Sequence, residues 1–164
     1  MTFAVTLLRQ QSVPPGGISA FWIAIGIAIW TARRLWALPI NRSRSGRLAG
    51  LMYLMMAMAS GAIALSDWFV VVLSSAIVFG GVFVAVVAAT THLIRRNVRP
   101  HRWTGVFARF TVGFGLALTV GSAATGALAD SYGLTTGVAT SAAALGAAAV
   151  AAALQPDPEH HRRA

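Results

Sequence analysis

The sequence lacks cysteine and lysine, and it carries few charges of either sign. The absence of cysteine among its 164 residues excludes disulfides, thiolate catalysis and cysteine-ligated zinc. Acidic residues number four, and Asp, Glu, Lys and Arg together make up 10% of the chain. A soluble domain of this size keeps far more polar surface toward water, so the composition argues against a soluble fold.

Apolar residues dominate what is present, at 57% of the chain and a mean hydropathy of +0.70. They form five segments near the length of roughly 20 residues that a helix needs to cross a bilayer. The segments show no alternation of polar and apolar residues, which excludes barrel strands. We therefore predict an all-α integral membrane protein with five transmembrane helices, at 18–36, 48–66, 69–93, 103–129 and 134–154. Residues 1–17 are then an N-terminal remnant on the outer face, and 155–164 a polar cytoplasmic tail.

All thirteen basic residues are arginine, and most lie in alternate connectors. Five of them fall at the end of the first segment or between it and the second, four between the third and fourth, and two in the tail, whereas Asp67 and Asp130 occupy the other connectors. By the positive-inside rule, this distribution predicts an outside N-terminus and a cytoplasmic C-terminus in a bacterial inner membrane. It also accounts for the net charge of +9 without a nucleic-acid partner. The expected partner is the lipid bilayer. The loop arginines singled out are Arg42, Arg44, Arg95 and Arg96.

Small residues recur within the third and fourth segments. Such residues let helices approach closely in lipid, where packing drives association. Close packing is predicted at these glycines, and a codon bias toward Ala and Gly is the alternative explanation. The glycines are Gly80, Gly81, Gly113, Gly115, Gly121 and Gly126.

Three side chains are candidates for a substrate pathway. Arg109 lies within the fourth segment, where an ionisable group is costly and marks a candidate functional site that attracts an anionic or polar group. Its alternative role is to extend to the inner interface. Tyr53 and Trp30 are candidate cavity-lining aromatics, with core packing as their alternative. His92 stands alone, so no catalytic set, metal site or cofactor site is predicted and the chain is not expected to be an enzyme.

Four stretches together resemble one transporter family. They are Phe-Trp-Ile-Ala-Ile-Gly-Ile-Ala at 21–28, Ser-Ala-Ile-Val-Phe-Gly-Gly-Val-Phe-Val at 75–84, Thr-Val-Gly-Phe-Gly at 111–115, and Gly-Ala-Leu-Ala-Asp-Ser-Tyr-Gly at 126–133. Their order resembles helices eight to twelve of a major facilitator superfamily (MFS) transporter, in the C-terminal half of its YbfB/YjiJ-type branch. The resemblance implies that Asp130 and Gly133 belong to a family turn motif, and that Arg42 and Arg44 stand where the family has a cytoplasmic motif.

The resemblance also implies a function. It implies transport of a small molecule across the membrane, coupled to an ion. The family pattern has Gly-Gln where this chain has Ala117-Leu118, and Gly-Pro where it has Gly121-Ser122. Because the family fold has twelve helices, we expect a truncated or split transporter that is completed by a second chain supplying the N-terminal half, or by self-association. The alternative is a non-transporting membrane scaffold or a degenerate fragment.

Overall fold

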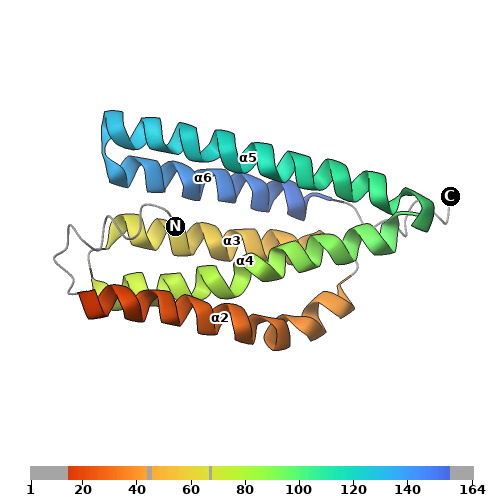
Figure 1. Ribbon diagram of the computed structural model, residues 1–164, viewed down its shortest axis with the longest axis horizontal. Coiled ribbons are helices and arrows are strands. Elements are labelled where there is room, and N and C mark those ends of the chain that lie inside the picture. The colour runs from red at the N-terminus through yellow and green to blue at the C-terminus, as the bar shows by residue number, and fades with distance from the viewer. Residues whose placement is uncertain (1–14, 44–45, 67, 156–164) are drawn as a thin grey trace.

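The computed structural model describes residues 15–43, 46–66 and 68–155, and within these ranges the chain forms helices and no strand. Five helices are long and apolar enough to cross a membrane (Figure 1). The predicted all-α membrane architecture with five transmembrane helices is therefore confirmed. The elements are α2 (Pro15–Arg42), α3 (Arg47–Leu65), α4 (Phe69–Asn97), the 3-10 turn η1 (Pro100–Arg102), α5 (Trp103–Tyr132) and α6 (Leu134–Ala153).

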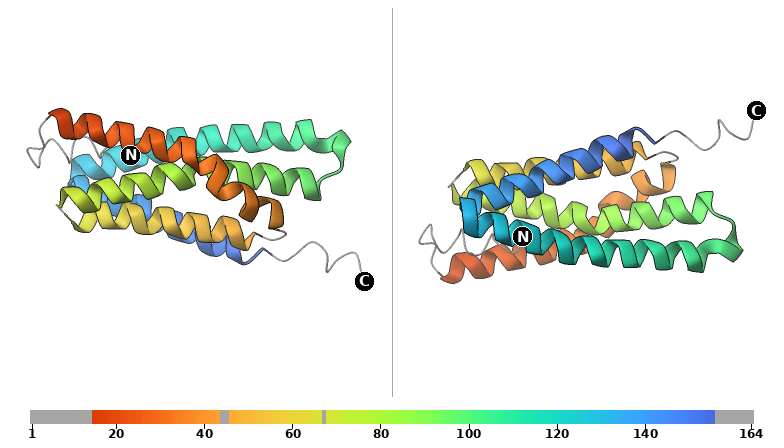
Figure 2. Two further views of the ribbon diagram at one scale, coloured as in Figure 1. Left: turned by 90° about the horizontal axis from the view of Figure 1, so that it is seen from below. Right: turned by 90° about the horizontal axis from the view of Figure 1, so that it is seen from above.

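The helices differ most from the expected segments in α2, which begins before residue 18 and continues past residue 36. Pro15 suits a helix start, where a missing N–H breaks no hydrogen bond. The last part of α2 departs from the direction of the rest (Figure 2). Pro39 accounts for this bend, because it lacks the N–H that would donate to the carbonyl of Leu35 and its ring crowds that carbonyl. Arg44, Asp67 and nearly all of the expected remnant and tail lie outside the described residues.

The core is formed by α2, α3 and α4. Phe21 from α2, Met52 from α3 and Val72 from α4 are its largest fully buried side chains. One buried cluster joins the three helices near the start of α2, and a second joins them near its end. The first contains Phe21, Ile25, Ile63, Val72 and Ala76, and the second contains Ile40, Met52, Met56, Val82, Ala85, Val86 and Ala89.

The other two helices form a hairpin that is attached to this core through α6. Helix α6 packs closely on α3, since a Cβ at Gly50 would lie 2.9 Å from the carbonyl oxygen of Ala149. Helices α5 and α6 lie side by side (Figure 1), and they are closest near their shared turn, where Gly137 faces Ala129. Every residue of α5 from 111 to 124 is exposed.

Candidate functional site

The three predicted pathway residues lie on three different helices and do not converge. Arg109 is exposed on α5, Tyr53 is half-buried on α3, and Trp30 is 71% exposed on α2. The pocket that contains Tyr53 is lined by neither Arg109 nor Trp30. The chain as described therefore does not assemble these three residues into one site.

Arg109 lies two turns into α5, about 9 Å along the axis from Trp103 at 1.5 Å per residue. It forms no ion pair or hydrogen bond with a residue that the structure describes. In a membrane, an arginine at this depth can extend its aliphatic stem along the helix so that the guanidinium reaches the interface. Its exposure on the bundle surface fits that arrangement.

Trp30 belongs to the outer surface of α2 and to neither core cluster. The Arg34 guanidinium lies 5.7 Å from the centroid of its ring, in a cation–π contact one turn along the helix. Within the described chain, α2 turns this side chain outward and away from the core.

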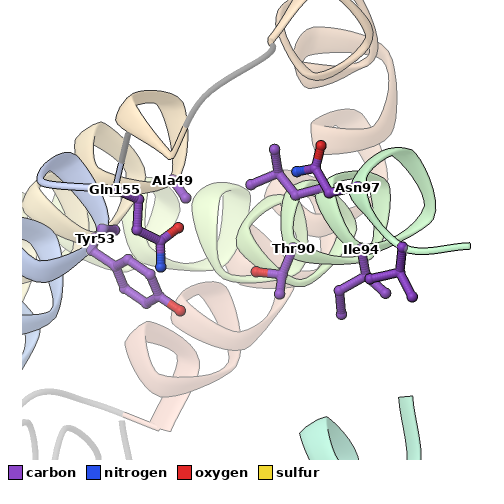
Figure 3. A pocket seen from close by; sticks show the side chains of 9 residues that line it. Ala49, Tyr53, Thr90, Ile94, Asn97 and Gln155 are labelled. Atoms are coloured by element: carbon purple, nitrogen blue, oxygen red, sulfur yellow. The ribbon is translucent and has the colours of Figure 1, made fainter. Parts of the chain in front are cut away.

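Tyr53 lines a pocket of about 350 Å³ between α3, α4 and α6. Figure 3 shows Tyr53 and Gln155 on one side of it, with Thr90, Ile94 and Asn97 on the other. Thr90 donates its hydroxyl to the carbonyl oxygen of Val86 at 2.9 Å, whereas Tyr53, Asn97 and Gln155 make no side-chain hydrogen bond to a described residue. Sequence reasoning found only Tyr53. Asn97 and Gln155 carried a weak signal, as neutral amides near the ends of apolar segments.

The predicted packing glycines divide into two groups. A Cβ at Gly80 would lie 3.1 Å from Cγ2 of Ile25, and one at Gly81 would lie 3.7 Å from the carbonyl oxygen of Ala28, so α4 closely approaches α2 there. A Cβ built on any of the α5 glycines would meet no atom of a neighbouring helix of the described chain within 4 Å. Close packing within the chain is therefore not found at Gly113, Gly115, Gly121 and Gly126.

The sequence interpretation missed three closely packed glycines, two that face α6 and one within it. Gly46 lies against Ala152, and Gly50 lies against Ala149. A Cβ built on Gly137 would lie 3.1 Å from Cβ of Ala129. Their partners are alanines and backbone carbonyls, which no local pattern distinguishes from the rest of an alanine-rich helix.

The loop arginines lie at one end of the bundle. Arg42, Arg95 and Arg96 are exposed, and Arg44 lies outside the described residues. The Arg95 guanidinium lies 5.8 Å from the Trp103 ring centroid, and Nε1 of Trp103 donates to the carbonyl oxygen of Val98 at 2.8 Å. These contacts hold α4 and α5 together at their connection.

The predicted turn motif lies at the other end, between α5 and α6 (Figure 1). Gly133 has φ of 92°, a region that glycine adopts without a Cβ clash, and its N–H donates to the carbonyl oxygen of Ala129 at 2.9 Å. Asp130 is exposed beside it. The geometry assigns Gly133 to the turn, and Asp130 forms no ion pair with any described residue.

No group of three or more His, Cys, Asp or Glu side chains occurs among the residues that the structure describes. Nε2 of His92 is buried without a hydrogen-bond partner, and His92 belongs to no such group. The described geometry thus offers helix packing, exposed arginines at one end and a pocket lined by Tyr53.

Large apolar side chains face outward around the bundle, among them Ile23, Leu35, Leu65 and Val120 at 62–90% exposed. Together with five spanning helices, these surfaces define a multi-pass α-helical membrane protein. The model of a family described as "uncharacterised MFS-type transporter YbfB" matches residues 1–155, so the chain belongs to this family. Comparison with curated proteins and with solved structures finds no match. The resemblance to a YbfB-type MFS transporter is confirmed, and its restriction to helices eight to twelve stays a prediction.

Proposed function

We propose that the chain transports a small molecule across a bacterial inner membrane, coupled to an ion, as one part of a YbfB-type MFS transporter. The observation that carries this proposal is the family match over residues 1–155, together with five membrane-spanning helices. The chain is proposed to supply helices eight to twelve of the transporter. It would then need a second bundle, from another chain or from a second copy.

The packing of α5 supports the need for a second bundle. Transporters of this superfamily bind substrate between two six-helix halves that rock about the site. The middle of α5 is exposed on all sides, and Gly113, Ala117 and Gly121 leave a stripe of small residues at four-residue spacing. Small residues at this spacing favour close helix association in membranes. Helix α5 is thus the element best suited to border a path shared with a second bundle.

The charge distribution supports an orientation with the α4–α5 connection in the cytoplasm. Exposed arginines gather at that end, whereas Asp130 lies at the opposite one. The cysteine-free chain allows a direct test with His101→Cys and Ser131→Cys, which stand at opposite ends. In intact cells a membrane-impermeant maleimide should label the cysteine at 131 only, and labelling of the cysteine at 101 alone would reverse the orientation.

Transport is tested in inverted membrane vesicles from cells that produce the chain, compared with vesicles from cells that do not. Panels of radiolabelled sugars, amino acids and organic acids, and a fluorescent cationic dye, serve as probes. We expect chain-dependent movement of at least one solute, abolished by a protonophore if the coupling ion is a proton. No chain-dependent flux of any probe would favour the scaffold. Flux by the purified chain as a strict monomer would remove the need for a second bundle.

A further inference from the structure

The pocket between α3, α4 and α6 lies at the arginine-rich end of the bundle. Ala49 is in the first turn of α3, Asn97 is the last residue of α4, and Gln155 follows α6. From Thr90 to Asn97 the pocket follows α4 for about 10 Å, at 1.5 Å per residue. That span reaches from the helix end into the depth at which lipid headgroups give way to acyl chains.

The pocket is lined by both apolar and hydrogen-bonding side chains. Leu93, Ile94 and Ala152 supply apolar surface, and Tyr53, Asn97 and Gln155 supply polar groups without a described hydrogen-bond partner (Figure 3). A phenol and two amides can each donate a hydrogen bond to an ester or phosphate oxygen. A ligand that matches this lining carries both an apolar part and acceptor oxygens.

The positive charge near the pocket favours anionic members of this class of ligand. Arg47 stands two residues before Ala49, and Arg96 and Arg99 flank Asn97 and Val98; all three are exposed, and none forms an ion pair with a described residue. Among described residues the only acidic side chain is Asp130, at the far end. The sequence after Gln155 contains two acidic residues, Asp157 and Glu159, and two arginines, Arg162 and Arg163, so its formal charges sum to zero.

We propose that this pocket binds one anionic phospholipid. An acyl chain lies along Leu93 and Ile94, the ester and phosphate oxygens accept hydrogen bonds from Tyr53, Asn97 and Gln155, and the neighbouring arginines attract the negative headgroup. Basic pockets between transmembrane helices hold anionic headgroups in this way. The proposal is independent of transport, because it rests on the pocket and on the charge of this end alone.

The test is native mass spectrometry of the detergent-solubilised full chain titrated with phosphatidylglycerol, with phosphatidylcholine of the same acyl chains, and with sn-glycerol 3-phosphate. We expect one saturable phosphatidylglycerol with several-fold preference over phosphatidylcholine, and no competition by glycerol phosphate. Tyr53→Phe and Asn97→Ala should each weaken binding roughly 2- to 10-fold, the effect of one hydrogen bond. The matched controls Tyr132→Phe and Asn41→Ala lie outside the pocket and should leave binding unchanged.

Three results would overturn the proposal. Equal binding of the two phospholipids would show that the arginines do not select charge. Competition by glycerol phosphate at the concentration of the lipid would show an anion site instead of a lipid site. Unchanged binding in Tyr53→Phe and Asn97→Ala, with melting temperatures equal to that of the unsubstituted chain, would place the lipid elsewhere.

Discussion

Helices α4 and α5 have nearly the same length, 29 and 30 residues, yet they are packed in opposite ways. Helix α4 buries eight residues against α2 and α3, whereas Ala129 is the one buried residue of α5. Both carry glycines, but Gly80 faces Ile25 while Gly113 and Gly121 face no atom within 4 Å in the described chain. In lipid, apolar surface is stable whether or not another helix covers it, so burial depends on a partner with a complementary face.

The largest effect should come from removing a buried side chain of the packed region. Met52→Ala leaves a cavity at a fully buried position, and we expect a loss of about 2–4 kcal/mol in the free energy of unfolding. Leu116→Ala on α5 removes a side chain that is 62% exposed and should cost less than about 0.5 kcal/mol. Unfolding in mixed micelles by increasing SDS fraction measures both. Equal losses would mean that α5 is as well packed as the core.

Adding a side chain should also destabilise the packed region more than it destabilises α5. Gly50→Leu forces atoms toward the Ala149 carbonyl, which is backbone and cannot move aside, so a loss of about 1–3 kcal/mol is expected. Gly121→Leu meets open space and should leave the stability of the purified monomer within about 0.5 kcal/mol. The same SDS unfolding assay applies. A destabilised Gly121→Leu monomer would contradict the open face of α5.

The turn between α5 and α6 should show an intermediate effect. Gly133→Ala places a Cβ on a residue with φ of 92°, which costs about 1–2 kcal/mol. Gly146→Ala lies within α6 with open space around it, and it should be neutral or stabilising by up to about 1 kcal/mol. Thermal unfolding followed by circular dichroism separates them. A neutral Gly133→Ala would mean that the turn adopts another backbone conformation.

The smallest effect concerns the connection that ties α5 to the core. Trp103→Phe keeps an aromatic ring but loses the hydrogen bond from Nε1 to the Val98 carbonyl, so we expect a loss of about 0.5–1.5 kcal/mol. Trp22→Phe, an exposed tryptophan on α2, should change stability by less. Hydrogen exchange at the end of α4 gives a local readout. Protection there that is unchanged in Trp103→Phe would argue against this hydrogen bond.

The sequence predicted the helices well because length, apolarity and loop charge are local properties. Pro39 lies beyond the first expected segment, yet α2 continues through it, since the remaining hydrogen bonds and the contacts of Ile40 offset one missing donor. The pairing of helices was less predictable. Gly50 and Gly137 pack tightly whereas Gly113 does not, and this difference depends on which helix lies opposite. The pocket joins residues from three helices, and the sequence does not show which residues of different helices meet. Tyr53 was therefore the one lining residue among the predicted site candidates.

The most direct test of the account is a cysteine-accessibility scan of α5 in membranes of cells that produce the chain. Single cysteines at positions 111–124 of the cysteine-free chain would be treated with a water-soluble maleimide. If α5 borders a water-filled path shared with a second bundle, labelling should recur every three or four residues along the helix. Labelling at no position, together with uniform reaction with a lipid-dissolved reagent, would show α5 surrounded by lipid and would contradict the proposed transport path.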